Sequence, residues 1–207
     1  MYLHEALRGH IRLRLHPAAT YMQPGGSIMG TNAELEKVYF DTMLYIYEYI
    51  EENAESGCAF ARIKDGGFLL KVSVLNRIEM HGYMAKHLPN FQKIDPLQVP
   101  EVVNDGFDKI MGQINERGAV CETSLEGIDA YAMLDATLEA HRLSRRYFYE
   151  HGKIADSMDM LHLKAAENMG CSKFVTKDRA LLSLRGHGLF PNMRILSIGD
   201  FCNQRGR

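Results

Sequence analysis

Short apolar runs that alternate with segments of helical periodicity are the feature that most limits the folds open to this chain. Such runs predict strands at 38–40, 68–72, 119–121, 173–176 and 194–198. Helical spacing is expected from about 42 to 50, from 73 onward, at about 101–115, at 126–150, from about 157, and briefly after 178. Strands that alternate with helices are typical of a parallel sheet covered on both faces. We therefore predict a three-layer α/β/α sandwich around a central parallel five-stranded sheet.

The same pattern divides the 207 residues into three segments. Residues 1–36 differ from the rest. Polar and apolar residues alternate at 10–16, and prolines and glycines follow. We interpret them as an N-terminal arm, with Met29 as an alternative start. Residues 37–201 form the expected domain, and 202–207 a tail.

Composition narrows the class of protein. The 46% hydrophobic and 24% charged fractions are those of an ordinary globular protein and exclude wholesale disorder. No stretch is apolar enough for a membrane span, and the first fifteen residues hold no apolar run, so no signal peptide is expected. The cysteines at 58, 121, 171 and 202 are widely spaced. This spacing predicts neither a zinc site nor a disulfide framework, and hence a cytoplasmic protein.

Basic residues concentrate in the last third of the chain. Residues 142–207 carry more Lys and Arg than Asp and Glu, whereas the preceding part is acidic. This asymmetry fits either a phosphate-bearing partner or a surface whose charges balance within one domain. Arg142, Arg145 and Arg146 share one helix face by their spacing. A solvated face is the default interpretation, and contact with RNA phosphates is the alternative.

Two acids stand where parallel sheets bind their ligands. Asp41 directly follows the strand at 38–40, and Asp178 lies two residues past the strand at 173–176. Ligands of such sheets bind beyond the carboxyl ends of the strands, so both acids belong to one candidate site edge. Each acid could also simply cap the helix that follows it.

Four segments resemble, in order, the motifs of the PIN-domain family, which includes VapC-type toxins. Val38–Thr42 is similar to its first strand ending in Asp-Thr, Ser73–Glu79 to its second motif, Asp159–Ala166 to its Asp-x-x-His-Leu-Ala-x-Ala helix, and Phe174–Arg179 to its Phe-Val-Thr-x-Asp-Arg motif. The resemblance spans about residues 37–200. The stretch between Glu79 and Asp159 is longer than in small toxin-type members.

The resemblance implies a metal-dependent ribonuclease. Its catalytic and metal-binding residues would be Asp41, Glu79, Asp159 and Asp178, around one or two Mg²⁺ or Mn²⁺ ions. Hard divalent cations prefer oxygen ligands, and Mg²⁺ retains waters that can attack a phosphodiester. The expected partners are an RNA substrate, an antitoxin-like protein and further copies of the chain.

Neighbouring residues receive supporting roles in this interpretation. Asp156 is expected to cap the helix that starts near Ser157, with Asp159 at the capping-box position. His162 lies one turn after Asp159, where a packed or supporting histidine is expected rather than a metal ligand.

Two other classes remain as alternatives. An Asp-based phosphotransferase would need a second Asp two residues after Asp41, where this chain has Met43. A non-catalytic PIN-like interaction module would be expected to lack at least one of the four carboxylates, and all four are present.

Overall fold

The computed structural model describes residues 35–49, 54–65, 67–92, 97–116, 122–123, 130–152 and 155–204. The strand expected at 119–121 lies outside these residues. So do residues 1–34, with the alternation at 10–16 and the alternative start at Met29.

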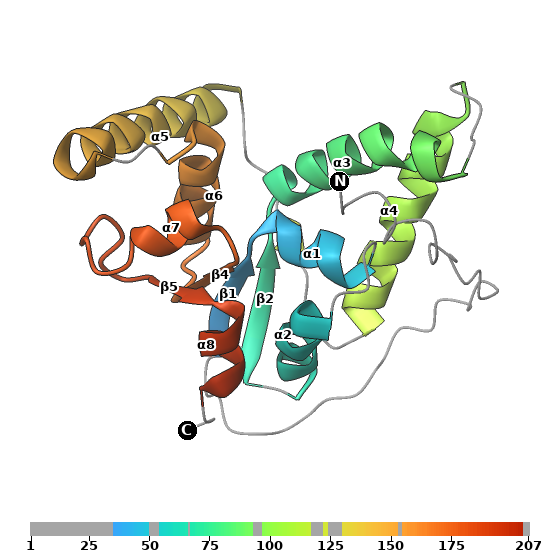
Figure 1. Ribbon diagram of the computed structural model, residues 1–207, viewed down its shortest axis with the longest axis horizontal. Helices are drawn as coiled ribbons and strands as arrows, with labels where there is room; N and C mark the ends of the chain where they lie inside the picture. The colour runs from blue at the N-terminus through green and yellow to red at the C-terminus, as the bar shows by residue number, and fades with distance from the viewer. Residues whose placement is uncertain are drawn as a thin grey trace, which may run out of the picture.

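A parallel sheet forms the centre of the molecule (Figure 1). Its strands are β1 (Glu36–Phe40), β2 (Phe68–Val72), β3 (Glu122–Thr123), β4 (Lys173–Thr176) and β5 (Arg194–Ser197). They lie in the order β3-β2-β1-β4-β5, and every neighbouring pair is parallel. The predicted α/β fold with a parallel sheet is confirmed, although β3 has only two residues beside four strands of four or five.

Helices connect and cover these strands. They are α1 (Thr42–Tyr49), α2 (Ala54–Lys64), α3 (Val74–Gln92), α4 (Val99–Glu116), α5 (Ala130–His151), α6 (Ser157–Asn168), α7 (Arg179–Ser183) and α8 (Ile198–Asn203). The sequence did not predict α2 or α8. Ser197 caps α8, so β5 ends one residue before the predicted strand does. The expected boundary after residue 201 therefore falls inside α8.

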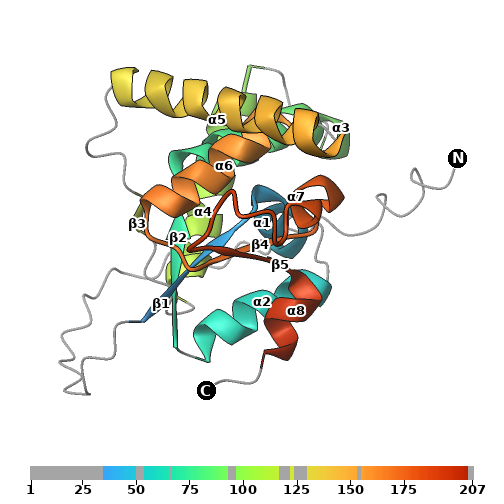
Figure 2. The same cartoon turned by 90° about the vertical axis from the view of Figure 1, so that its left-hand side faces the viewer.

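The two faces of the sheet have separate cores. Figure 2 shows α5 and α6 on one side of the strands and α2 and α8 on the other. Along β1, Val38 and Phe40 belong to the core beneath α2 and α8, whereas Tyr39 belongs to the core beneath α6. Phe40 packs edge-on against Phe60 of α2 and Phe201 of α8, with ring centroids 5.2 and 5.5 Å apart. The alternation of a strand between two covered faces thus produces the layered arrangement.

A disulfide joins α2 to α8, which the cysteine spacing did not predict. It links Cys58 to Cys202, whose Cα atoms are 6.2 Å apart and which are separated by 144 residues. Cys171 is a free, buried thiol. The prediction that the chain has no disulfide framework is therefore wrong for this pair, because only the fold brings the two residues together. Disulfides are typical of oxidising compartments, so the cysteines do not support a cytoplasmic location.

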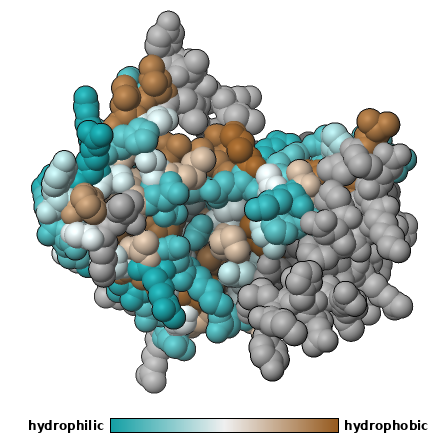
Figure 3. All heavy atoms as spheres, turned by 45° about the horizontal axis from the view of Figure 1, so that its top comes forward, coloured by the Kyte–Doolittle hydropathy of each residue, from teal (hydrophilic) through white to brown (hydrophobic). Residues whose placement is uncertain are grey.

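The described surface is mixed in polarity. Hydrophilic residues cover much of the face in Figure 3, with hydrophobic residues gathered between them. A few large apolar side chains are exposed, among them Ile78 of α3 and Leu134 and Leu138 of α5. None of the helices in the described part of the chain has the length and hydropathy needed to cross a membrane.

Removing the disulfide should destabilise the protein. We expect Cys202→Ser to lower the free energy of unfolding by about 2 to 4 kcal/mol, because the cross-link restricts the unfolded chain. Urea unfolding with and without dithiothreitol measures this effect. Reductant should bring the wild-type midpoint down to that of Cys202→Ser and leave the variant unchanged. Equal wild-type midpoints in both conditions would contradict the cross-link.

Candidate functional site

Asp41 is held at the carboxyl end of β1 by the neighbouring strand. Its backbone N–H donates to the carbonyl oxygen of Val175 in β4 at 2.9 Å. The hydroxyl of Thr176 donates to Asp41 Oδ2 at 2.6 Å. The residue is only 9% exposed. Its carboxylate thus contacts β4 across the sheet instead of making a helix-capping bond, which was the simpler interpretation of its position.

Asp178 follows β4 at the same edge of the sheet. Its N–H donates to Thr176 Oγ1 at 2.9 Å, so one threonine contacts both acids. Asp178 Oδ1 accepts from the N–H groups of Ala180 and Leu181 at 2.5 and 3.1 Å, which makes it the N-cap of α7. The expected placement of Asp41 and Asp178 at one edge is confirmed, since β1 and β4 are parallel neighbours. The capping role of Asp178 is confirmed as well.

Asp159 belongs to the first turn of α6. Asp156 is the N-cap and accepts from Met158 N at 2.9 Å, as expected from the sequence. Asp159 Oδ2 accepts from Asp156 N at 3.2 Å and completes a capping box. One carboxylate oxygen of Asp159 is therefore occupied by a hydrogen bond at the N-terminus of α6.

Glu79 of α3 is oriented by a buried histidine. His162 of α6 is 2% exposed, and its Nε2 lies 2.8 Å from Glu79 Oε2. Its Nδ1 lies 2.7 Å from the hydroxyl oxygen of Tyr39, which in turn lies 2.6 Å from Ser73 Oγ. Four side chains thus form a hydrogen-bonded chain, Ser73–Tyr39–His162–Glu79, beneath the acidic edge. The expectation that His162 is a packed, supporting residue agrees with this geometry.

A buried asparagine ties the loops after β1 and β2 together. The Asn76 amide donates to the Phe40 carbonyl and to Thr42 Oγ1, each at 3.1 Å. Its Oδ1 accepts from the N–H of Ser73 at 2.9 Å. Asn76 is fully buried, and these bonds satisfy an amide that would otherwise be costly to bury. Sequence reasoning missed Asn76, Tyr39 and Ser73. The Ser-x-x-Asn spacing after a strand was the one local signal.

The acids influence one another electrostatically. Burial raises the pKa of Asp41, against the hydrogen bond from Thr176. The charges of Glu79 and Asp178 raise it further, whereas His162 lowers it. Mutual repulsion of this kind requires that the groups lie close to one another. Asp41 is therefore the member that interacts with the other three acids, because Asp159 responds to it as well.

Asp159 and Glu79 shift in opposite directions. Burial raises the pKa of Asp159 to about 6, with further contributions from the charges of Asp178 and Asp41. Burial also pushes the pKa of Glu79 upward, but the hydrogen bond and charge of His162 outweigh it and the pKa is lowered. Glu79 is consequently an ionised acceptor of the His162 Nε2–H.

The donor set suits a hard cation, although the side chains do not converge on one. Asp41 Oδ1, Asp159 Oδ1 and Asp178 Oδ2 have no hydrogen-bond partner among the described residues. Carboxylate oxygens are the ligands that Mg²⁺ and Mn²⁺ prefer. Across residues 35–204, gaps excepted, no three His, Cys, Asp or Glu side chains are already placed to hold one ion. The metal-binding role of the four acids stays a prediction.

The arginines singled out in the sequence lie on the surface of α5. Arg146 pairs with Glu150 at 2.8 Å, and Arg142 lies 3.7 Å from Glu139. Both partners are exposed residues of the same helix, so these contacts agree with the solvated face that was the default interpretation.

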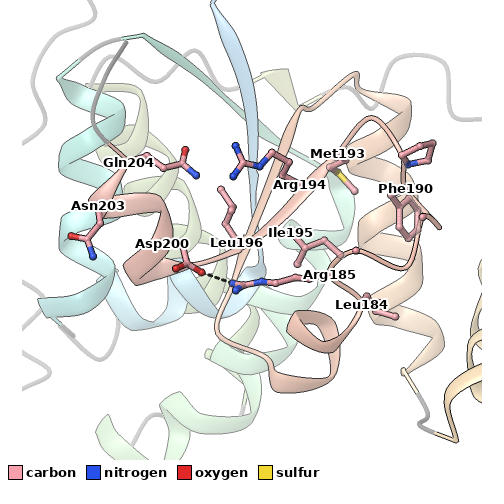
Figure 4. A pocket seen from close by; sticks show the side chains of 13 residues that line it. Leu184, Arg185, Phe190, Met193, Arg194, Ile195, Leu196, Asp200, Asn203 and Gln204 are labelled. Atoms are coloured by element: carbon pink, nitrogen blue, oxygen red, sulfur yellow. Dashed lines mark ion pairs between the residues drawn. The ribbon is translucent and has the colours of Figure 1, made fainter.

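A cavity of about 730 Å³ lies beside β5, and none of the four acids lines it. It extends along β5 and α8, and Arg185 and Asp200 pair across it at 2.7 Å (Figure 4). Apolar side chains including Phe190 and Met193 form much of the remaining lining. The cavity is therefore distinct from the acidic edge.

Comparisons with known proteins give little further guidance. Neither a family model nor a curated protein matches the sequence. Among solved structures, the fold is similar to the crystal structure of VapBC2 from Rickettsia felis bound to a DNA fragment from their promoter. That match has a TM-score of 0.48 and 12% sequence identity, and covers 78% of this chain and 98% of that chain. At these values no property of that complex is transferred to this protein.

The raised pKa of Asp159 predicts a specific pH dependence of stability. A carboxyl whose folded pKa lies above the unfolded value contributes stability below the unfolded pKa near 3.8, and this is lost as pH rises through about 6. Relative to Asp159→Asn, the wild type should lose about 1 to 2 kcal/mol of unfolding free energy between pH 4 and pH 7, after allowance for solvent screening. The asparagine oxygen can still accept from Asp156 N.

Urea unfolding in EDTA at a series of pH values measures this difference. Asp65→Asn, which removes an exposed charge at the end of α2, is the control and should follow the wild-type profile. Parallel profiles for the wild type and Asp159→Asn would show that Asp159 is not crowded by other acids.

Proposed function

We propose that this protein is a divalent-metal-dependent endoribonuclease in which Asp41, Glu79, Asp159 and Asp178 bind Mg²⁺ or Mn²⁺. The observation that carries the proposal is the crowding of acids on Asp41 at the carboxyl edge of the sheet, where the Glu79 and Asp178 charges act on a buried carboxylate. Two unit charges about 4 Å apart repel by roughly 4 kcal/mol at an effective dielectric near 20. Acids that lie near one another repel, and a bound cation would offset this repulsion.

The hydrogen bonds of the acids indicate which of their oxygens would bind the ion and which residues would position them. Asp41 and Asp178 share the Thr176 hydroxyl, which fixes their relative position and leaves Asp41 Oδ1 and Asp178 Oδ2 for the ion. The buried His162 would position Glu79 through its hydrogen bond to Oε2. Mg²⁺ or Mn²⁺, when bound, would stabilise the charge that develops on the phosphodiester and lower the pKa of an attacking water.

Rotation of carboxylates is part of this proposal. Asp159 and Asp178 each direct one oxygen to a helix N-terminus. A carboxylate has a second oxygen that can bind an ion while the first keeps its hydrogen bond. The proposal therefore requires that the three aspartates converge by side-chain rotation when the ion binds.

A non-catalytic interaction module is the second candidate. It is favoured by the fact that no three of the described side chains are already placed to hold an ion. An antitoxin-like partner and self-association would fit either function. In the nuclease, Arg145 or its neighbours on α5 would contact RNA phosphates. An Asp-based phosphotransferase gains no support, because no acid follows two residues after Asp41.

Loss of the central carboxylate should abolish cleavage. We expect Asp41→Asn to reduce Mn²⁺-dependent hydrolysis of single-stranded and structured RNA by at least about 100-fold, because even residues that only support metal ligands account for 10- to 100-fold. Asp65→Asn, which removes an equal charge from the surface, should retain full activity. Gel analysis of labelled RNA measures both.

Chelation separates the two candidate functions. A nuclease should be inactive in excess EDTA and recover on addition of Mn²⁺. Undiminished cleavage in EDTA would contradict the metal mechanism. No cleavage by the wild type under any divalent ion, together with no change of its melting temperature by Mn²⁺, would favour the interaction module.

Breaking the hydrogen-bonded chain Ser73–Tyr39–His162–Glu79 should weaken metal binding. Tyr39→Phe removes the hydroxyl between Ser73 and His162 but keeps the buried ring. We expect the Mn²⁺ concentration for half-maximal cleavage to rise about tenfold, because His162 then orients Glu79 less firmly.

Tyr147→Phe is the matched control. Tyr147 is also buried, and its replacement by Phe removes a hydroxyl bond to Ser183 at 2.9 Å. Unlike Tyr39, it makes no hydrogen bond to His162. Its Mn²⁺ dependence should equal that of the wild type. If both variants change in stability alone, with the Mn²⁺ requirement unaltered, Tyr39 has no positioning role.

A further inference from the structure

Two histidines meet on the α5–α7 side of the sheet, outside the acidic edge. His151 is the last residue of α5, and His187 lies between α7 and β5. Nε2 of His151 is 2.6 Å from Nδ1 of His187, and the rings are nearly perpendicular at 80°. The site proposed above uses neither residue.

Two contacts to Tyr147 hold the ring of His151. It stacks on the ring of Tyr147 with centroids 4.6 Å apart and 15° between the planes. Tyr147 is itself anchored through its hydroxyl to Ser183. Nδ1 of His151 lies 3.3 Å from the Tyr147 carbonyl oxygen, to which a neutral imidazole would donate its proton. The lone pair then lies on Nε2, toward His187. Metal-binding histidines commonly donate their other N–H to such a carbonyl.

His187 is presented by a backbone that only glycine adopts readily. Gly186 and Gly188 flank it with φ of 76° and 71°. These left-handed conformations turn the short segment after α7 so that the exposed His187 side chain faces the end of α5. Two elements from different parts of the chain thereby place two imidazole nitrogens side by side.

We propose that His151 and His187 form a binding site for Zn²⁺ or a similar borderline transition-metal ion. The present contact holds one proton between two nitrogen lone pairs. A metal ion can take the place of that proton. The proton then leaves Nδ1 of His187, and the exposed ring of His187 carries its N–H on Nε2 instead. Imidazole nitrogen suits zinc, copper and nickel, whereas Mg²⁺ and Ca²⁺ prefer oxygen.

Little movement is needed to admit the ion. Zinc binds imidazole nitrogen at about 2.0 to 2.1 Å, so two such ligands in a tetrahedron are about 3.3 Å apart. The observed 2.6 Å must therefore widen by well under 1 Å, which the glycine-flanked segment around His187 can provide. Waters complete the coordination.

The carboxylate next to His151 in the sequence is already paired with an arginine. Glu150 precedes His151 and forms an ion pair with Arg146 at 2.8 Å. The site therefore depends on the two imidazole nitrogens and not on Glu150. Bound metal would link the end of α5 to the segment that follows α7.

Calorimetric titration of the full chain with Zn²⁺ tests the site. The wild type should bind one more equivalent of Zn²⁺ than His187→Gln, with an affinity at least tenfold above any remaining site. His81→Gln, a histidine in α3, is the matched control and should keep the wild-type stoichiometry. This difference measurement also accounts for histidines elsewhere in the chain, such as those at 4, 10 and 16.

Competition and melting complete the test. A tenfold excess of Mg²⁺ should not displace the ion, which separates this site from the acidic edge. Zn²⁺ should raise the melting temperature of the wild type and of His81→Gln but not of His187→Gln. Equal Zn²⁺ stoichiometry and equal melting shifts in the wild type and His187→Gln would overturn the proposal.

Discussion

Parallel pairing of β1 with β2 on one side and β4 on the other is the constraint on which the rest of the structure depends. Phe40 lies opposite Val175, and the N–H of Asp41 continues the ladder to the Val175 carbonyl. Carboxyl ends of parallel strands share an edge, so acids placed after different strands meet there across long stretches of sequence. A register slip of one residue would exchange Tyr39 and Phe40 between the two cores and break the contact of Asp41 with Thr176.

Features encoded by neighbouring residues were predictable from the sequence. The apolar runs predicted β2 and β4, all of β1 but its first two residues, and β5 with one residue too many. The spacing of Asp156 and Asp159 predicted the start of α6. By contrast, α2 was missed because its buried face includes the small residues Ser56 and Ala59, which weaken the apolar periodicity. The start of α8 was read as strand because Ile198 prolongs an apolar run, and only the Ser197 cap ends it.

Contacts between distant residues could not be predicted in the same way. Asp41 and Asp178 were identified from their places after strands, and Glu79 and Asp159 from the family resemblance. The bonds that orient these acids, however, join residues far apart in sequence. Tyr39 is separated from His162 by 123 positions, and its strand position indicated only an apolar side chain. The direction of each carboxylate also depends on local competition, as Asp178 shows by turning one oxygen to its own helix. Residue identity therefore supplied candidates for a site, and not the bonds that orient them.

The disulfide between α2 and α8 encloses most of the fold in one covalent ring, yet β1 lies outside it. The ring from Cys58 to Cys202 contains β2 to β5, whereas β1 ends at Phe40 and precedes it. The ring therefore limits how far the segments that carry β2 to β5 can separate, whereas it places no such limit on the middle strand of the sheet. Whether Asp41 stays at the edge of the sheet therefore depends on the pairing of β1 with β2 and β4, and not on the cross-link.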